Sequence, residues 1–384
     1  MVSVVHSVAA QSDHEQSLQT LADGLSPNEA AALRLAADQA RSLYGDKLLG
    51  SGESVWAHAL GVALIIAGLK LDADCRLAAL LFAVPVLQEK GLQPLEKDFG
   101  ARVVHLVDGV SRLNRMRPIT RRFVAHSAGD GDKNAQELRA QVEVLRKMLL
   151  AMVEDIRVVL LRLASRTQTL RYYASEADEL RVPVAQETLA LYSPLANRLG
   201  VWELKWELED LSFRFLHPAV YKQIARHLDE TRREREKFIA DAVSRLKAEL
   251  VAAGIRHAEV YGRPKHIFSI WNKMRQKGVD FSEVYDLRAL RVVVDEEKDC
   301  YTALGIVHHL WSPIPKEFDD YISNPKGNDY RSLHTAVNCP DGRALEVQIR
   351  THEMHRHAEL GVAAHWRYKE GSGATPEDLD DEKI

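Results

Sequence analysis

The pattern of apolar and polar positions is helical over most of the first half of the chain. Ser26, Pro27 and Glu29 provide a serine N-cap, a proline at N1 and a glutamate at N3, which predicts a helix beginning at residue 27. Apolar residues then recur with a helical period and predict helices near 27–43, 54–69, 72–89, 99–113, 133–152, 155–175 and 184–198. Three more helices are expected between 200 and 254, the last over 230–253. Residues 1–25 are polar and weakly patterned, so we expect a mobile tail there.

After Gly254 the pattern changes to short β-type runs separated by helical ones. Strands are expected over 257–261, 287–295, 332–338 and 344–351, and helices over 266–277, 298–310 and 352–366. The predicted fold class is therefore a helical domain followed by an α+β domain with a mixed sheet of at least four strands. The expected divisions are a tail (1–25), a helical domain (26–198), a helical connector (199–254), the α+β domain (255–371) and an acidic linker (372–384), after which further domains are expected.

Composition narrows the class of protein. A formal net charge of −4 over 384 residues does not suggest a general nucleic-acid binder, and no sequence-specific DNA binding is expected. The three cysteines are widely spaced, which indicates neither a disulfide framework nor a zinc motif. The longest apolar runs are shorter than the roughly 20 residues that span a bilayer, and no signal peptide is evident. A cytoplasmic location is the simplest interpretation.

A cationic helix face is predicted over 266–277. Lys265, Ser269 and Lys273 follow at i, i+4 and i+8, so they share one face. The opposite, apolar face is made by Ile267, Ile270, Trp271 and Met274. The first N–H groups of a helix and nearby cations both attract anions, which suits a polyphosphate. A solvated cationic face is the alternative.

The strand expected over 344–351 carries a carboxylate on its polar side. Leu345, Val347 and Ile349 alternate toward the core, which leaves Glu346, Gln348 and Arg350 on the other face. Asp286 stands just before another strand, and two such carboxylates could hold one Mg²⁺ or act as a general base. The alternative is a pair of structural ion pairs, Asp286–Arg288 and Glu346–Arg350. Strict alternation puts Asp286 and Arg291 on opposite faces, so one site containing both needs a bulge or a late strand start.

A polar loop over 324–330 precedes a further strand. It contains Lys326 and Asn328 and ends with Tyr330, an aromatic residue that could stack on a base. His334, four residues later, could contact phosphate or ribose. A tyrosine that only caps the strand is the alternative.

Four segments, YGRPKHIFSIWNKM (261–274), YDLRALRVVV (285–294), NPKGNDYRSLHT (324–335) and LEVQIRT (345–351), together resemble the synthetase domain of the RelA/SpoT family. The resemblance runs from about residue 260 to 371 and implies a nucleotidyltransferase-like fold. It implies transfer of the β,γ-pyrophosphate of ATP to the 3′-hydroxyl of GDP or GTP. It further implies that Arg263 and Arg291 hold the adenine between them, and that Lys265, Ser269 and Lys273 bind the ATP phosphates.

The resemblance also assigns the metal and the acceptor nucleotide. Asp286 and Glu346 would bind Mg²⁺, with Glu346 also the candidate base, and Tyr330 would stack on guanine. The remaining residues expected around the acceptor are Lys326, Asn328, His334 and Gln348. The motif Glu317-Phe318-Asp319-Asp320 resembles the acidic E-x-D-D version of monofunctional, RelA-type synthetases, which implies a preference for GDP and a stronger need for Mg²⁺. A generic acidic loop is the alternative.

The helical half resembles, more loosely, the HD-type hydrolase domain of the same family. His58 fits the first metal ligand. The His-Asp pair expected next is Phe82-Ala83, the Glu-Asp pair is Val86-Leu87, and the late aspartate is Ser165. One histidine among such residues does not hold a first-row metal. We therefore expect no pyrophosphohydrolase activity, and a hydrogen-bonded core histidine at position 58.

The leading hypothesis is thus a magnesium-dependent synthetase that uses ATP and GDP or GTP, with the ribosome as a partner through domains beyond this chain. The alternative is a catalytically silent regulator that senses guanine nucleotides. The presence of both Asp286 and Glu346 favours the enzyme, because a sensor does not need both carboxylates.

Overall fold

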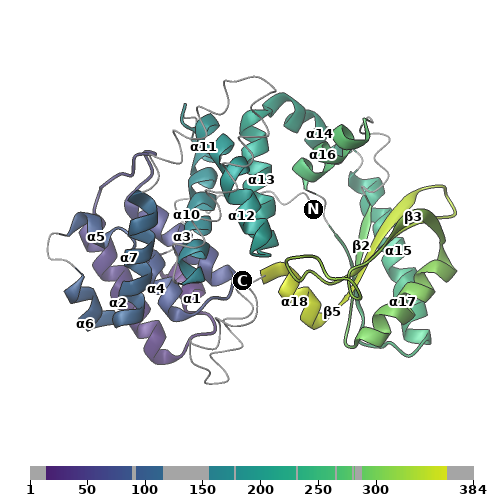
Figure 1. The fold of residues 1–384 in the computed structure, drawn as a ribbon, viewed down its shortest axis with the longest axis horizontal. Coiled ribbons are helices and arrows are strands. Elements are labelled where there is room, and N and C mark those ends of the chain that lie inside the picture. The colour runs from purple at the N-terminus through teal and green to yellow at the C-terminus, as the bar shows by residue number, and fades with distance from the viewer. Residues whose placement is uncertain are drawn as a thin grey trace. The chain divides into compact units, whose positions relative to one another are not determined.

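The computed structural model describes residues 14–88, 92–115, 155–176, 179–230, 232–263, 266–278, 281 and 288–360. The chain divides into two compact units, one built on Val5–Ala196 and the other on Asn197–Gly361. Figure 1 shows helices in the first unit and a sheet with helices in the second.

The first unit is helical. Its described elements are α1 (His14–Ala22), α2 (Pro27–Tyr44), α3 (Val55–Gly68), α4 (Ala73–Leu81), α5 (Val84–Leu87), α6 (Gln93–Phe99), α7 (Ala101–Arg115), α10 (Ile156–Ser175), α11 (Arg181–Glu187), the π-helix η1 (Thr188–Tyr192) and α12 (Ser193–Arg198), which ends just beyond it. The capping box at the start of α2 is confirmed, because Ser26 and Glu29 exchange side-chain and backbone hydrogen bonds. Helix α3 packs against α4 and α10, and α4 also packs against α2 and α7.

The expectation of a mobile tail over residues 1–25 is wrong for residues 14–22, which form α1. Leu18 and Leu21 are buried, and α1 packs against α2 and α3. Nη1 of Arg76 donates to the carbonyl oxygen of Leu21 over 2.7 Å. Two leucines in a polar segment give a weak periodic signal, yet their burial is enough to dock a short helix.

Two expected helices are interrupted. The helix expected over 72–89 breaks at Phe82 and Ala83, because Pro85 lies in the first turn of α5 and cannot continue the hydrogen bonding of α4. The hydroxyl of Tyr44 fills the break, since it donates to Leu80 O and accepts from Ala83 N–H. The helix expected over 184–198 is divided into α11, η1 and α12. The helix expected over 133–152 lies outside the described residues.

The second unit is α+β, as predicted. Its elements are α13 (Trp202–Leu216), α14 (Pro218–Glu230), α15 (Arg232–Ala252), β1 (Glu259–Gly262), α16 (Ile267–Lys277), β2 (Ala289–Val294), α17 (Glu297–Leu310), β3 (Ser312–Asp320), β4 (Leu333–Asn338), β5 (Ala344–Thr351) and α18 (His352–Leu360). The expected connector over 199–254 is not a separate region. Helix α15 packs against β1, and α13 packs against α16 and α18, so these helices belong to the α+β unit.

The sheet has five strands in the order β1-β2-β5-β4-β3. Strands β2 and β5 are parallel, and the other neighbours are antiparallel. Strand β5 has the predicted bounds. Strand β3 was not predicted, because it is a largely exposed edge strand with two prolines and a run of charges, and so it lacks the alternation of a half-buried strand.

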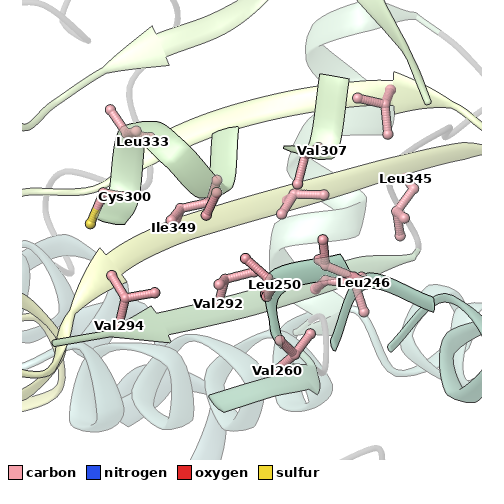
Figure 2. Close-up of a cluster of buried hydrophobic side chains, with 14 of the residues drawn as sticks. Leu246, Leu250, Val260, Val292, Val294, Cys300, Val307, Leu333, Leu345 and Ile349 are labelled. Atoms are coloured by element: carbon pink, nitrogen blue, oxygen red, sulfur yellow. The ribbon is translucent and has the colours of Figure 1, made fainter. Parts of the chain in front are cut away.

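One face of the sheet carries the hydrophobic core of this unit. Side chains from alternate positions of the strands pack against α15 and α17, and Figure 2 shows among them Val292, Val294, Leu333, Leu345 and Ile349 beside Leu246, Leu250, Cys300 and Val307. The predicted inward positions of β5 are therefore confirmed. The residues at the alternate positions, several of them polar, lie on the other face of the sheet.

No helix among the described residues is long and apolar enough to cross a membrane.

Candidate functional site

A row of polar side chains crosses the face of the sheet opposite the core. The register pairs Asp319 of β3 with His334 of β4, His334 with Gln348 of β5, and Gln348 with Arg291 of β2. Residues paired across neighbouring strands point to the same face. The structure therefore brings together four residues that the sequence placed in four separate motifs.

Glu346 occupies the next row and is flanked by small residues. Its cross-strand partners are Ala289 on β2 and Ala336 on β4. The carboxylate of Glu346 is half-buried between these two methyl groups. Oε1 of Glu346 accepts a hydrogen bond of 2.7 Å from Nε2 of Gln348, which fixes the orientation of the carboxylate.

Arg291 is held in the row by a residue that the motifs did not identify. Its Nη1 donates to Oε1 of Glu359 on α18 over 2.7 Å, and its Nη2 lies 3.4 Å from Oε1 of Gln348. Glu359 Oε1 also accepts from Nη2 of Arg350 over 2.8 Å. Arg350 thus pairs with Glu359, whereas the sequence alternative paired it with Glu346. The sequence signal for Glu359 was limited to its place on a polar helix just after β5.

Burial and neighbouring charges have opposite effects on the pKa of Glu359. Burial alone would raise the pKa of the Glu359 carboxyl, but Arg291 and Arg350 outweigh it and hold that pKa below its usual value. His355, which hydrogen-bonds to Arg350, has its pKa lowered to about 4 by burial and by the charge of Arg350. Glu359 is therefore ionised and His355 neutral near pH 7.

Arg263 follows β1 directly, and its backbone N–H donates to the carbonyl of Ala289 over 2.8 Å. Its guanidinium lies over the ring of Trp206 on α13, with Cζ 5.1 Å from the ring centroid. Burial lowers the pKa of Arg263, Glu346 opposes that effect, and Arg291 adds to it. Both arginines expected to hold adenine thus influence one another electrostatically. Lys265 lies outside the described residues.

Helix α16 has the predicted apolar face. Ile267 and Ile270 are buried, and Trp271 and Met274 pack against the same cluster. Ser269 and Lys273 are half-buried away from it. At the first turn, Oδ1 of Asp210 from α13 accepts from Phe268 N–H over 2.8 Å. A carboxylate therefore already uses one of the N–H groups expected to attract phosphate.

Tyr330 is half-buried in an aromatic cluster. Its ring meets Trp202, Tyr321 and His334 in edge-on contacts with centroid separations of 5.8, 6.2 and 5.7 Å. The Tyr330 hydroxyl lies 2.9 Å from Nε2 of His334. Burial lowers the pKa of His334 to about 4, so this imidazole is neutral at physiological pH and can accept that hydrogen bond.

The other residues of the loop hold its shape. Nζ of Lys326 lies 4.2 Å from the ring centroid of Tyr321, at a cation–π distance. Nδ2 of Asn328 donates to the carbonyl of Asn197 over 3.1 Å. Asp329, between Asn328 and Tyr330, has a positive φ of 56°. The loop is thus ordered around Tyr330 by backbone and aromatic contacts.

Successive residues of the acidic motif point to opposite faces of β3. Asp319 shares the face of His334, and its carboxylate hydrogen-bonds to Tyr321. Asp320 points elsewhere: its Oδ1 accepts from Ile322 and Ser323 backbone N–H groups, and its Oδ2 accepts from the Tyr301 and Ser323 hydroxyls. Glu317 lies on the exposed part of β3. Within the motif, Asp319 faces the candidate site and Asp320 shapes the turn after β3.

Asp286 lies outside the described residues, so the structure leaves its assignment as a prediction. Strand β2 begins at Ala289, two residues later than predicted. Within the described ranges, no group of three or more His, Cys, Asp or Glu side chains could hold a metal ion. Glu346 is a carboxylate, and carboxylate oxygen is the ligand type that Mg²⁺ prefers.

In the helical unit, His58 contacts two of the residues that replace the expected metal ligands, Phe82 and Ser165. His58 is 3% exposed; its Nδ1 lies 2.7 Å from Oε2 of Glu53, and its Nε2 lies 2.9 Å from Oγ of Ser165. Phe82 packs against the imidazole with ring centroids 5.4 Å apart. The prediction of a hydrogen-bonded core histidine is confirmed. Of the other replaced positions, Ala83 is buried, Leu87 is half-buried and Val86 is 77% exposed.

Solved structures give weak overall similarity. Small alarmone synthetase 1 from Bacillus subtilis bound to its product pppGpp aligns at 24% identity and a TM-score of 0.30, over 41% of this chain and 86% of that one. Small alarmone synthetase 2 from Bacillus subtilis aligns at 27% identity and a TM-score of 0.28, over 38% and 84%. Scores this low do not by themselves establish a shared fold.

Family models and sequence relatives match most of the chain. An HD domain model matches residues 32–202, and the model of the region found in RelA/SpoT proteins matches 262–373. A protein named GTP pyrophosphokinase from Escherichia coli strain K12 is 47% identical to this chain over 81% of this chain. One of the same name from Photobacterium angustum is 46% identical over 83% of this chain. The chain spans 40% and 42% of the length of these two relatives. With both domains matched in the order that the structure shows, the chain belongs to the RelA/SpoT family.

Proposed function

We propose that the α+β unit is a GTP/GDP pyrophosphokinase that transfers the β,γ-pyrophosphate of ATP to the 3′-hydroxyl of GDP or GTP. The observation that carries the proposal is the row of Arg291, Gln348, His334 and Asp319 beside Glu346. One end of the row holds an arginine expected at the donor. His334, in the same row, contacts Tyr330, expected at the acceptor, and the strand that carries Glu346 lies between the strands of Arg291 and His334. The relatives named GTP pyrophosphokinase support the same assignment.

The proposed reaction needs a proton acceptor near the acceptor hydroxyl. The 3′-oxygen attacks the β-phosphorus of ATP, the bond from that phosphorus to the α-phosphate oxygen breaks, and AMP leaves. Glu346 takes the proton from the 3′-hydroxyl as general base, and its bond from Gln348 keeps the carboxylate oriented. Arg291 and Arg263 bind the donor, and Tyr330 with His334 binds the guanine nucleotide.

Mg²⁺ is the proposed cofactor. When bound by Glu346 and Asp286, it would neutralise charge on the transferred phosphates. The chain's own contribution is to place Glu346 between two alanines, with its carboxylate oriented by Gln348.

The test is to incubate the protein with ATP, Mg²⁺ and either GDP or GTP, and to separate the nucleotides by ion-exchange chromatography. We expect ppGpp or pppGpp together with an equal amount of AMP. Ribosomes are the proposed activating partner in the cytoplasm, so the assay is repeated with them. No product under either condition would instead favour the silent sensor of guanine nucleotides.

We also propose that the helical unit lacks pyrophosphohydrolase activity. The support is that His58 is engaged by Glu53 and Ser165, and that Phe82 packs against its ring. Gln168 donates to the other oxygen of Glu53 over 2.6 Å, which further consolidates the network. Incubation with ppGpp and Mn²⁺ should release no GDP above the rate without protein. Sustained GDP release would refute this part of the proposal.

A further inference from the structure

Helix α13 carries a stripe of large side chains on the side away from its own buried leucines. Trp202, Trp206 and Asp210 follow at i, i+4 and i+8 and therefore share one face. The buried side of the helix is made by other positions, including Leu204 and Leu208. Both tryptophans are only half-buried, so the stripe is not part of the hydrophobic core.

Trp206 contacts the donor side of the proposed site. Its ring stacks on His266, with centroids 4.7 Å apart and an interplanar angle of 18°. The guanidinium of Arg263 lies 5.1 Å from the same ring. Asp210, one turn further along α13, accepts from Phe268 N–H and lies 3.3 Å from Nδ1 of His266. Arg263 and His266 therefore both contact α13.

Trp202 contacts the acceptor side. Its ring meets Tyr330 edge-on at 5.8 Å, with an interplanar angle of 66°. Nζ of Lys205 lies 5.5 Å from the ring of Trp202, and Trp202 lies 6.1 Å from Trp206. One turn of a single helix thus separates a contact to the donor arginine from a contact to the acceptor tyrosine.

We infer that α13 sets both nucleotide subsites, with Trp206 as a positioning residue for the donor nucleotide and Trp202 as a positioning residue for the acceptor. The inference deepens the proposed function and rests on it. Arg263 has a pKa lowered by burial, so its charge is poorly solvated and needs an oriented partner. The face of an indole supplies one without neutralising the charge that ATP must meet. Trp202 acts through its edge-on contact with Tyr330, which restricts the orientation of that ring.

The expected effects are selective. Loss of a cation–π contact weakens binding by about 2- to 30-fold, so Trp206→Ala should raise the Kd and KM for ATP by that factor and leave those for GDP within about twofold. Trp202→Ala should do the reverse. Trp206→Phe keeps an aromatic face and should recover most of the ATP affinity, whereas Trp206→Leu should not.

Binding and turnover are measured separately on the whole chain. Isothermal titration with α,β-methylene ATP, whose bridge prevents transfer, gives donor affinity, and titration with GDP gives acceptor affinity. Steady-state rates give the two KM values. Leu204→Ala is the control for a structural role of α13, because Leu204 is 2% exposed. It should lower the melting temperature without separating the two affinities.

The inference is established if Trp206→Ala loses affinity for ATP but not for GDP, and Trp202→Ala loses affinity for GDP but not for ATP. It is overturned if either variant changes both affinities equally, as Leu204→Ala would, or changes neither. If the wild-type protein binds both nucleotides but makes no product, the proposed function fails and the titrations still decide the inference. If the wild-type protein transfers pyrophosphate and the variants bind normally, only the inference fails.

Discussion

Nη1 of Arg291 donates to Oε1 of Glu359 over 2.7 Å, and the same oxygen accepts from Arg350. Glu359→Ala would leave both guanidinium groups near the sheet without this counter-ion. Because Arg291 and Arg350 are 6% and 1% exposed, we expect destabilisation of roughly 2–4 kcal/mol and a higher KM for ATP. Urea denaturation measures the first and steady-state kinetics the second. Glu353→Gln, at an exposed position of the same helix, is the matched control and should change neither.

Glu346→Gln tests the proposed general base. The amide keeps the size of the side chain but cannot take a proton, so the transfer rate should fall by about 10²–10⁴. The melting temperature should remain close to that of the wild type, because the residue is half-buried between two alanines. A variant that transfers pyrophosphate at the wild-type rate would remove Glu346 from the mechanism.

The stability of the protein should fall as the pH is lowered from about 6.5 to 4. His334 and His355 have folded-state pKa values of about 4, below the value of about 6.5 in an unfolded chain. Between these limits the unfolded state binds more protons, so the free energy of unfolding decreases with decreasing pH. Denaturation midpoints between pH 4.5 and 7.5 measure the slope. His334→Gln should reduce the slope, and His309→Gln, exposed on α17, should leave it unchanged.

The two aspartates of the acidic motif should separate in their effects. Asp320→Asn weakens the acceptor that orders the turn of Ile322 and Ser323, so a lower melting temperature is expected. Asp319→Asn should leave the melting temperature nearly unchanged and alter the ratio of GDP to GTP use, because Asp319 shares the face of His334. If the wild type and Asp319→Asn use GDP and GTP in the same ratio, Asp319 does not influence the choice of acceptor.

His58→Ala should destabilise the helical unit. The substitution removes the 2.7 Å hydrogen bond between the imidazole and the carboxylate of Glu53, which is 3% exposed, and losing one partner of a buried polar group costs roughly 1–3 kcal/mol. Thermal unfolding followed by circular dichroism gives the change. His105→Ala, at an exposed position of α7, serves as the comparison and should have little effect.

The sequence by itself determined the elements that depend on local pattern. The capping box of Ser26 and Glu29, the apolar face of α16 and the inward residues of β5 all follow from chemistry within a few turns or residues. The replacement of the expected metal ligands around His58 was likewise visible in the linear order of residues. The edge strand β3 and the docked helix α1 were missed, because neither has a strong local period.

Only the tertiary structure decided which residues meet. The row from Asp319 to Arg291 depends on pairings between strands that are distant in sequence, and a one-residue change of register would reverse every face. Glu359, Trp206 and Asp210 act through contacts with Arg291, Arg263 and Phe268, and no spacing along the chain specifies those contacts. Local patterns fix the elements that have a strong period, but the packing of whole helices on the sheet fixes the neighbours of each charged side chain.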